Sequence, residues 1–356
     1  MDNSIGDRVA RLIPRGEQGR VAAAVGMTPD ALSRAIHGQR GFGAAELMRI
    51  ADHFDADLHT LISGEPDPRR PRLVARHDYD QSTRTRSIPG HSADRPILDD
   101  ITLAYRQALL APREGWSAPS DVEAARTQLG AGFVRPFVER IEERLGIEVV
   151  RVGELSTAYS FIVDGRPVIA IPATASWFRE NWSIAHELGH LVLGHHANPE
   201  TRDADERAAH GFAAELLLPA ADMRSLDWQG VTPADLAAWI WDLGVSTEAL
   251  ANRLESLGIE SPVVRDWSGY TTQRLLRHHW VPSEADDPIT IRMDAAAVRR
   301  FPVALQTAHL DRIARGEVGK GILAWMLGVA DDSLEVEEPT PRPGVSTSDL
   351  LDALGI

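Results

Sequence analysis

Residues 186–190 read His-Glu-Leu-Gly-His, a run whose spacing suits metal-dependent hydrolysis. Two histidines four positions apart on a helix lie one turn apart on the same face, so both imidazoles can bind one metal ion. Glu187 projects beside them and can take a proton from a water that the ion acidifies. The run therefore predicts a zinc site with His186 and His190 as ligands and Glu187 as catalytic residue, with manganese as an alternative metal.

A catalytic zinc site needs a third protein ligand, and the residues offer three candidates, His196, its neighbour His195 and Glu206. His196 follows His190 at the metzincin spacing, but the position where that pattern needs a glycine holds Leu193. Glu206, near the start of the next predicted helix, could point back at the ion if the two helices pack antiparallel. Asp205 is its adjacent alternative, and the residues alone leave the choice open.

Two more histidines lie near these candidates. His195 has no ligand spacing and is expected to be solvated or to support a ligand. His210 lies one turn after Glu206 on the same helix face. It could sit beside the ligands or donate a hydrogen bond to the transition state.

The elements that must position these residues follow from hydrophobic periodicity. Asp164-Gly165 is a strong signal for a tight hairpin turn, and in zincin folds the edge strand beside the metal-binding helix binds the substrate backbone. We predict helices over 99–111, 121–145, 182–193, 203–218, 233–243 and 246–257, and strands over 147–152, 159–163 and 167–171.

The domain organisation follows from changes in composition along the chain. Short helices are predicted over residues 5–64, whereas residues 65–100 are rich in Pro, Arg, Ser and Asp, which is typical of a linker. The fold is expected to be multidomain, with an all-α helix-turn-helix bundle, an α+β zincin-like metallopeptidase domain and a following helical region. The predicted boundaries are 1–66 for the bundle, 67–97 for the linker, 98–230 for the zincin-like domain, 231–258 for a helix pair and 259–356 for a C-terminal region of unknown role.

The chain resembles the ImmA/IrrE family of metallopeptidases over roughly residues 130–260. Three segments carry the resemblance: IAHELGHLVLGH, DERAAHGFAAELLLP and VTPADLAAWIWDLGVSTEALANRLESLG. In that family a glutamate ligand precedes a segment similar to FAAELLMP, and counting back from Pro219 places this ligand at Glu206. Three positions depart from the family pattern: Ala208 and His210 replace a common Glu and Asn, and Leu218 replaces a common Met.

Residues 18–40, QGRVAAAVGMTPDALSRAIHGQR, resemble the phage-repressor-like (XRE) helix-turn-helix. Gly26 would make the turn, and the second helix would enter the major groove of double-stranded DNA. Gln18, Thr28 and Arg40 are expected at phosphates or groove edges. Residues expected to face bases are Asp30, Ser33 and Arg34, of which Arg34 best suits guanine.

The charge balance makes any DNA contact a local one. The chain has a formal net charge of −15 at pH 7. Residues 1–66 hold seven Arg against nine Asp plus Glu, a difference of −2. Counterion release would rest on a few arginines, chiefly Arg15, Arg20, Arg34 and Arg40. The linker arginines Arg69, Arg70, Arg72 and Arg76 could add phosphate contacts.

Composition excludes several classes of function. The chain has no cysteine, which rules out disulfides, thiolate catalysis and Cys-ligated metal. No apolar run approaches the roughly 20 residues that span a bilayer, and the first residues lack a signal-peptide pattern. We therefore expect a cytoplasmic protein without membrane contact, and a homodimer remains an open alternative.

Family members cleave helix-turn-helix repressors and so switch stress responses or mobile-element genes. The resemblance implies a DNA-binding regulator with zinc endopeptidase activity, which cuts such a repressor or its own linker. An alternative is a transcriptional regulator whose metal domain senses a signal without proteolysis. A third is an antitoxin or immunity component that acts by binding alone.

Overall fold

The computed structural model describes residues 4–54, 56–65, 74–75, 78–80, 85–87, 91–197, 203–281 and 287–337. The chain divides into two compact units, Met1–Pro71 and Arg72–Ile356, each with its own hydrophobic core. The predicted linker contacts at Arg69, Arg70, Arg72 and Arg76 lie outside the described residues, as does the chain after residue 337.

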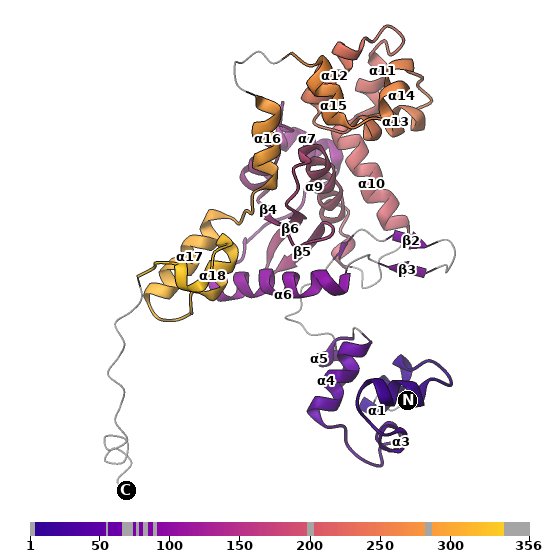
Figure 1. The fold of residues 1–356 in the computed structure, drawn as a ribbon, viewed down its shortest axis with the longest axis vertical. Coiled ribbons are helices and arrows are strands. Elements are labelled where there is room, and N and C mark those ends of the chain that lie inside the picture. The colour runs from indigo at the N-terminus through magenta and orange to yellow at the C-terminus, as the bar shows by residue number, and fades with distance from the viewer. Residues whose placement is uncertain are drawn as a thin grey trace. The chain divides into compact units, whose positions relative to one another are not determined.

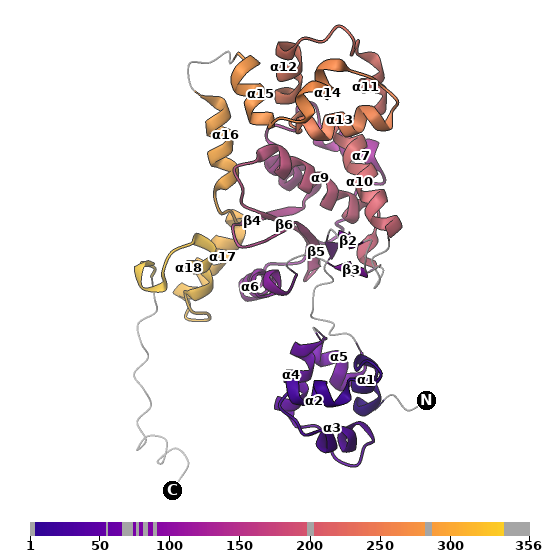
Figure 2. The same cartoon turned by 45° about the vertical axis from the view of Figure 1, so that its right-hand side comes forward.

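The N-terminal unit is a small bundle of short helices (Figure 2). The side chains of Val9, Leu32 and Ile50 are buried in its core. Gly26 has a φ of 69°, which only glycine adopts readily, and it forms the turn between the second and third helices. The five helices are α1 (Ile5–Leu12), α2 (Gln18–Ala24), α3 (Pro29–Ile36), α4 (Ala44–His53) and α5 (Leu58–Ser63).

The second unit contains a four-stranded sheet with the strand order β1-β5-β6-β4. Its strands are β1 (Val74–Ala75), β4 (Glu148–Val152), β5 (Tyr159–Val163) and β6 (Arg166–Pro172). β5 is antiparallel to both of its neighbours, whereas β4 and β6 are parallel. Asp164 and Gly165 both have positive φ, the geometry of a tight hairpin turn, as the sequence predicts.

Both faces of the sheet are buried against helices. Successive side chains of a strand point to opposite faces, so neighbouring residues belong to different cores. Val149 and Ile169 belong to the core that covers helix α9 (Trp177–Val192). Their neighbours Val150 and Val168 belong to the core around helix α6 (His91–Ala108) on the other face. The result is a helix–sheet–helix arrangement, which agrees with the expected α+β class (Figure 1).

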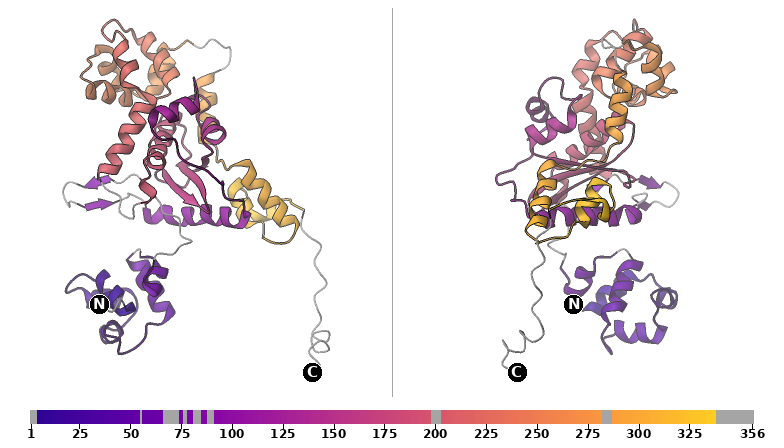
Figure 3. Two further views of the ribbon diagram at one scale, coloured as in Figure 1. Left: turned by 180° about the vertical axis from the view of Figure 1, so that it is seen from behind. Right: turned by 60° about the vertical axis from the view of Figure 1, so that its left-hand side comes forward.

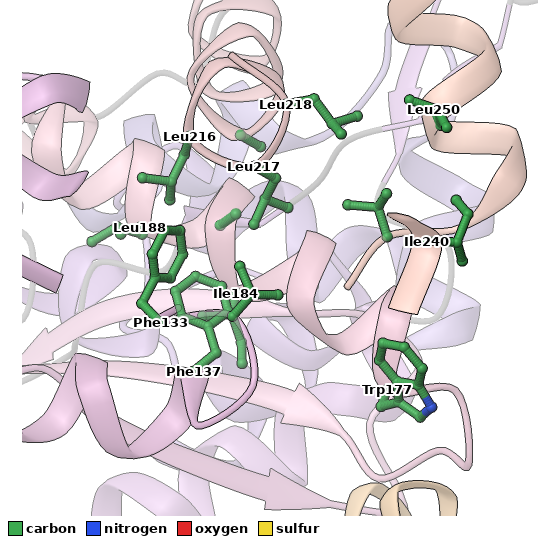
Figure 4. Packing of buried hydrophobic residues seen from close by; sticks show 14 of the residues in the cluster. Phe133, Phe137, Trp177, Ile184, Leu188, Leu216, Leu217, Leu218, Ile240 and Leu250 are labelled. Atoms are coloured by element: carbon green, nitrogen blue, oxygen red, sulfur yellow. The ribbon is translucent and has the colours of Figure 1, made fainter. Parts of the chain in front are cut away.

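The core on the α9 side is the larger one. Phe133 and Phe137 pack with a centroid distance of 5.1 Å, close to Ile184 and Leu188 of α9 (Figure 4). α10 (Asp203–Leu217) runs alongside α9 (Figures 1 and 3). The other elements of this core are α7 (Val122–Leu129), α8 (Phe137–Arg140), the π-helical turn η1 (Ile141–Leu145) and α11 (Ala220–Ser225), followed by α12 (Pro233–Leu243), α13 (Thr247–Ser256), α14 (Pro262–Ser268), α15 (Thr272–His279) and α16 (Pro288–Ala297).

The core on the other face forms where α6 crosses the sheet. Leu98, Ile101 and Tyr105 recur at helical spacing on α6 and are buried. α17 (Val303–Ala314) and α18 (Gly321–Leu327) pack on α6, with the short helix η3 (Asp331–Ser333) after them (Figures 1 and 3). Backbone hydrogen bonds of 2.8 Å in each direction join Arg300 to Arg151 at the free edge of β4.

Three sequence predictions differ from the structure. The predicted linker over 67–97 contains β1, the strand pair β2 (Asp78–Asp80) and β3 (Thr85–Ser87), and the first turns of α6. These segments lack apolar periodicity. β1 pairs with the distant strand β5, whereas β2 and β3 pair with each other. Residues 259–337 contribute to both cores of the second unit and are not a separate region.

The third difference is the predicted helix over 121–145, which breaks after Leu129. Gly130 and Gly132 have positive φ, which ends α7 and forces a turn before α8. The sequence prediction overlooked these two glycines. Among the residues that the structure describes, no helix combines the length and apolar character that a membrane crossing requires.

Candidate metal centre

Helix α9 presents the His-Glu-Leu-Gly-His run from inside the fold. Ile184, Leu188 and Leu191 are buried in the core on one side of the helix, which fixes its rotation. His186 and His190 therefore face away from that core, with ring centroids 4.8 Å apart. Both are buried, at 6% and 0% exposure, and buried polar groups need a hydrogen-bond partner or a metal ion.

The nitrogen and oxygen atoms of three side chains converge at this point. Nε2 of His186 lies 3.1 Å from Nε2 of His190. The Glu206 carboxylate oxygens lie 3.4 Å from His186 Nε2 and 3.6 Å from His190 Nε2. Ligands at zinc bond lengths in a tetrahedron stand about 3.4 Å apart, so the three side chains fit one such ion.

The chemistry of the donors also suits a cation. Two facing imidazole nitrogens repel each other through their lone pairs unless a proton or a metal ion lies between them. Glu206 brings a carboxylate that is mostly buried, with 13% of its side chain exposed. His186, His190 and Glu206 form a group that could hold a metal ion, the set that the sequence and the family resemblance predict.

Close packing of α10 against α9 brings Glu206 to this position. A Cβ atom added to Gly189 would lie 3.1 Å from Cα of Ala209 and from Cβ of Phe212. Glycine at this position therefore lets α9 and α10 lie closer together than a residue with a side chain would allow. Glu206 stands one turn before Ala209 on α10, at the level of the two histidines.

The other candidate ligands lie beside the cluster. Nδ1 of His195 lies 2.8 Å from Nδ1 of His190, and its Nε2 lies 3.8 Å from Asp205. When His190 donates through Nδ1, its Nε2 keeps a lone pair for a metal. Asp205 thus faces His195, and burial lowers the pKa of His195, which favours the neutral ring.

His196 does not join the cluster. It is 9% exposed, its ring lies next to the backbone of Ser160 on β5, and its Nε2 has no hydrogen-bond partner among the described residues. Burial lowers the pKa of His196, so the neutral form is favoured here as well. Its place is a packing position between the end of α9 and the sheet, and the metzincin alternative has no support from the geometry.

Glu187 points to the sheet and is fully buried. Its Oε2 accepts a hydrogen bond of 2.6 Å from the hydroxyl of Ser160, which is also fully buried. Tyr159 and Phe161, on either side of Ser160, face the opposite core, so strand alternation aims Ser160 at α9. The hydroxyl fixes one carboxylate oxygen of Glu187.

A buried network ties this strand to α6. Asp94 accepts hydrogen bonds from the hydroxyls of Tyr159, at 2.7 Å, and Ser156, at 2.6 Å. Burial, with a contribution from Asp94, raises the pKa of Tyr159 well above its ordinary value, so its hydroxyl stays protonated and donates. The network holds the start of β5, and with it Ser160, in register.

His210 is exposed and lies next to the cluster on α10. Its ring centroid is 6.5 Å from that of His186 and 5.2 Å from that of Trp182. His210 and Trp182 line a cavity of about 590 Å³, together with Arg179 and Arg207.

The structure places the predicted DNA contacts on α2, α3 and the turn that follows. Asp30 and Arg34 form an exposed ion pair of 2.8 Å along α3. Thr28 caps α3 by accepting from the Ala31 amide, and Arg40 is bound inside the bundle to Glu46, at 2.7 Å, and to the Ala31 carbonyl. Gln18 starts α2, and Ser33 is half-buried on α3.

Comparison with known families agrees with the metal site. A family model described as Peptidase_M78, IrrE N-terminal-like domain, matches residues 142–255. The match runs from η1 to the end of α13 and includes the three clustered side chains and Glu187. No curated protein and no solved structure matches the chain. The matched domain suggests a metallopeptidase-like activity for this part of the chain.

Sequence reasoning missed Ser160 and Asp94. A single serine inside the apolar run from Tyr159 to Val163 is a signal that could have indicated Ser160. Asp94 lies in the predicted linker and gives no such signal. Its role becomes visible only when α6 and β5 are placed together.

Proposed function

We propose that the second unit is a zinc-dependent endopeptidase. The observation that carries this proposal is the convergence of His186, His190 and Glu206 beside Glu187. A metal ion, when bound, acidifies a water and polarises the carbonyl of a peptide bond. Three protein ligands leave a coordination position open for this chemistry, whereas a structural site would be closed by a fourth.

The side chains divide the remaining work. Glu187 accepts the proton of the attacking water and returns it to the leaving amine nitrogen. Ser160 holds the Glu187 carboxylate in one orientation by donating to Oε2. The substrate backbone adds to β5 as an extra strand, and His210, whose ring centroid lies 6.5 Å from that of His186, donates to the developing oxyanion in this proposal.

The N-terminal unit supports a regulatory role. We propose that it binds double-stranded DNA through α3, and that the endopeptidase cleaves a helix-turn-helix repressor or this chain itself. The support is the resemblance of residues 18–40 to the repressor motif and the exposed Arg34. An exposed ion pair is worth little, so Arg34 can leave Asp30 for a guanine.

The endopeptidase is tested with a library of peptides from digested bacterial lysate. Zinc-loaded wild type and zinc-loaded Glu187→Gln are each incubated with the library, and new termini are identified by mass spectrometry. We expect a narrow set of cleavage sites that depends on Glu187. If no peptide in the library is cleaved in a Glu187-dependent way, the proposed peptidase activity is wrong.

Replacing Ser160 by alanine should lower kcat about tenfold, since the Glu187 carboxylate loses a donor worth about 1–3 kcal/mol. KM and metal content should stay unchanged. The measurement is the steady-state rate on a peptide from the library. Ser156→Ala is the matched control because its hydroxyl donates to Asp94. Equal losses in the two variants would show a general effect on β5.

DNA binding is tested by selecting from a pool of random double-stranded oligonucleotides with the full chain. We expect an enriched motif, and Arg34→Ala should lose preference at one base pair, by about 10- to 100-fold. Arg20→Ala, on the exposed side of α2, should weaken binding to all sequences alike. Selection that enriches no motif contradicts the proposed DNA-binding role.

A further inference from the structure

The edge of β5 beside the metal cluster is covered by another part of the chain. β1 pairs with it in antiparallel register, with Val74 opposite Ser160 and Ala75 opposite Tyr159. β1 also contacts helix α9. The segment that follows the N-terminal unit thus lies next to the residues proposed to perform catalysis.

This position matters because of what must bind there. Extended peptides bind enzymes by adding a strand to an exposed sheet edge. Ser160, the partner of Val74, donates to Glu187 at 2.6 Å, so a backbone at this point of the edge passes the proposed general base. A substrate strand and β1 would need the same backbone groups of β5.

We propose that β1 occupies the position of the substrate strand and holds the peptidase in a self-inhibited state. The proposal rests on the proposed endopeptidase function and adds its regulation. A protein substrate must displace Val74 and Ala75 before its own backbone can pair with β5. The enzyme therefore becomes active when β1 leaves the edge.

The length and attachment of β1 suit a displaceable inhibitor. Neighbouring pairs in an antiparallel ladder alternate between exchanging two hydrogen bonds and exchanging none. Of the pairs at Val74 and Ala75, one therefore carries the ladder bonds. The contact is weak, but helix α6 packs against β5 and keeps β1 at high local concentration.

The test is a double variant of the full chain, Val74→Pro with Ala75→Pro. Whichever residue donates to β5, its N–H is removed, because proline has none. The matched control is Tyr79→Pro in β2, which pairs with β3 and not with β5. Both variants leave the residues His186, His190, Glu206 and Glu187 unsubstituted.

The first measurement is hydrogen exchange of the peptide that contains β5, in protein without added metal. We expect faster exchange in the double variant at whichever of Tyr159 and Ser160 directs its N–H toward β1, since the other one faces β6, and wild-type exchange in the control. Unchanged exchange in the double variant would overturn the proposal, since β1 would not cover the edge in solution. This readout is independent of catalysis.

The second measurement is the rate of zinc-loaded protein on the peptide library. The double variant should cleave about tenfold faster at low peptide concentration, through a lower KM, and a synthetic peptide of residues 70–79 should reverse the gain. Faster exchange with an unchanged rate would overturn inhibition. Absence of all cleavage, together with faster exchange, would instead reject the endopeptidase and leave the strand pairing established.

A third outcome concerns cleavage of the segment itself. A new terminus within residues 70–79 of the zinc-loaded chain, absent in Glu187→Gln, would overturn the inhibitory role. β1 would then be a substrate held in the same chain.

Discussion

Glu187→Gln should abolish peptide cleavage while zinc remains bound. The amide keeps the shape of the side chain and can still contact the Ser160 hydroxyl, but it cannot accept the proton of the attacking water. General base catalysis of this kind contributes up to about 10⁴-fold, so we expect kcat to fall by roughly 10³-fold or more. The measurement is the cleavage rate on a peptide selected from the library, with zinc content determined on the same sample.

The control for this variant is the charge-conserving change Glu187→Asp, which keeps a base but shortens its reach. It should retain more activity than the glutamine variant. If Glu187→Gln cleaves at the wild-type rate, Glu187 is not the base, and the peptidase mechanism proposed for the second unit is wrong. A variant that loses zinc as well would indicate that Glu187 acts mainly through the structure of α9.

Glu206→Ala should remove the metal from a protein purified without added zinc. The wild type is expected to hold about one zinc per chain on three ligands, and two imidazoles alone bind far more weakly. We expect the dissociation constant to rise by at least roughly 100-fold, since changes to groups that only support the ligands already cost 10- to 100-fold. The measurement is elemental analysis, followed by competition with a chelator.

Asp205→Ala is the matched control on the same turn of α10. Its carboxylate faces His195 at 3.8 Å, not the converging nitrogens, so this variant should keep its zinc. If zinc is lost in the Asp205 variant and kept in the Glu206 variant, Asp205 and not Glu206 is the third zinc ligand. If the wild type holds no metal, the peptidase proposal is wrong, and the sequence alternative of a regulator that acts through binding takes its place.

The sequence predicts the elements of the metal site closely because their signals are local. The three strands β4, β5 and β6 agree with the predicted ranges to within one residue at each end. Alternation of side chains and the Asp164-Gly165 turn are properties of neighbouring residues. The helical periodicity that predicts α9 is also a property of neighbouring residues. The helix itself begins at Trp177, five residues before the predicted start. Glu206 required the family pattern, since residues alone left Asp205 and His196 open.

The rest of the fold depends on contacts between distant segments. Nothing in the composition of residues 67–97 indicates that part of them pairs with β5, because a two-residue strand has no periodicity of its own. The same limit applies to Asp94, whose partners Ser156 and Tyr159 lie more than sixty positions away. Residues 259–337 carry scattered aromatic side chains whose order comes only from the cores they complete.

Leu188 and Gly189, the two positions of the His-Glu-Leu-Gly-His run without a proposed chemical role, are constrained by packing. Leu188 is fully buried in the core that orients α9, and Gly189 lies where α10 passes within contact distance. The pentapeptide thus specifies a helix-packing interface as well as the proposed catalytic site. In a search for related enzymes, a small residue at the position of Gly189 would help to distinguish chains whose third ligand comes from a closely packed second helix. In protein design, transfer of the two histidines and the glutamate to another helix would reproduce the ligands but not the spacing that brings the third one within reach.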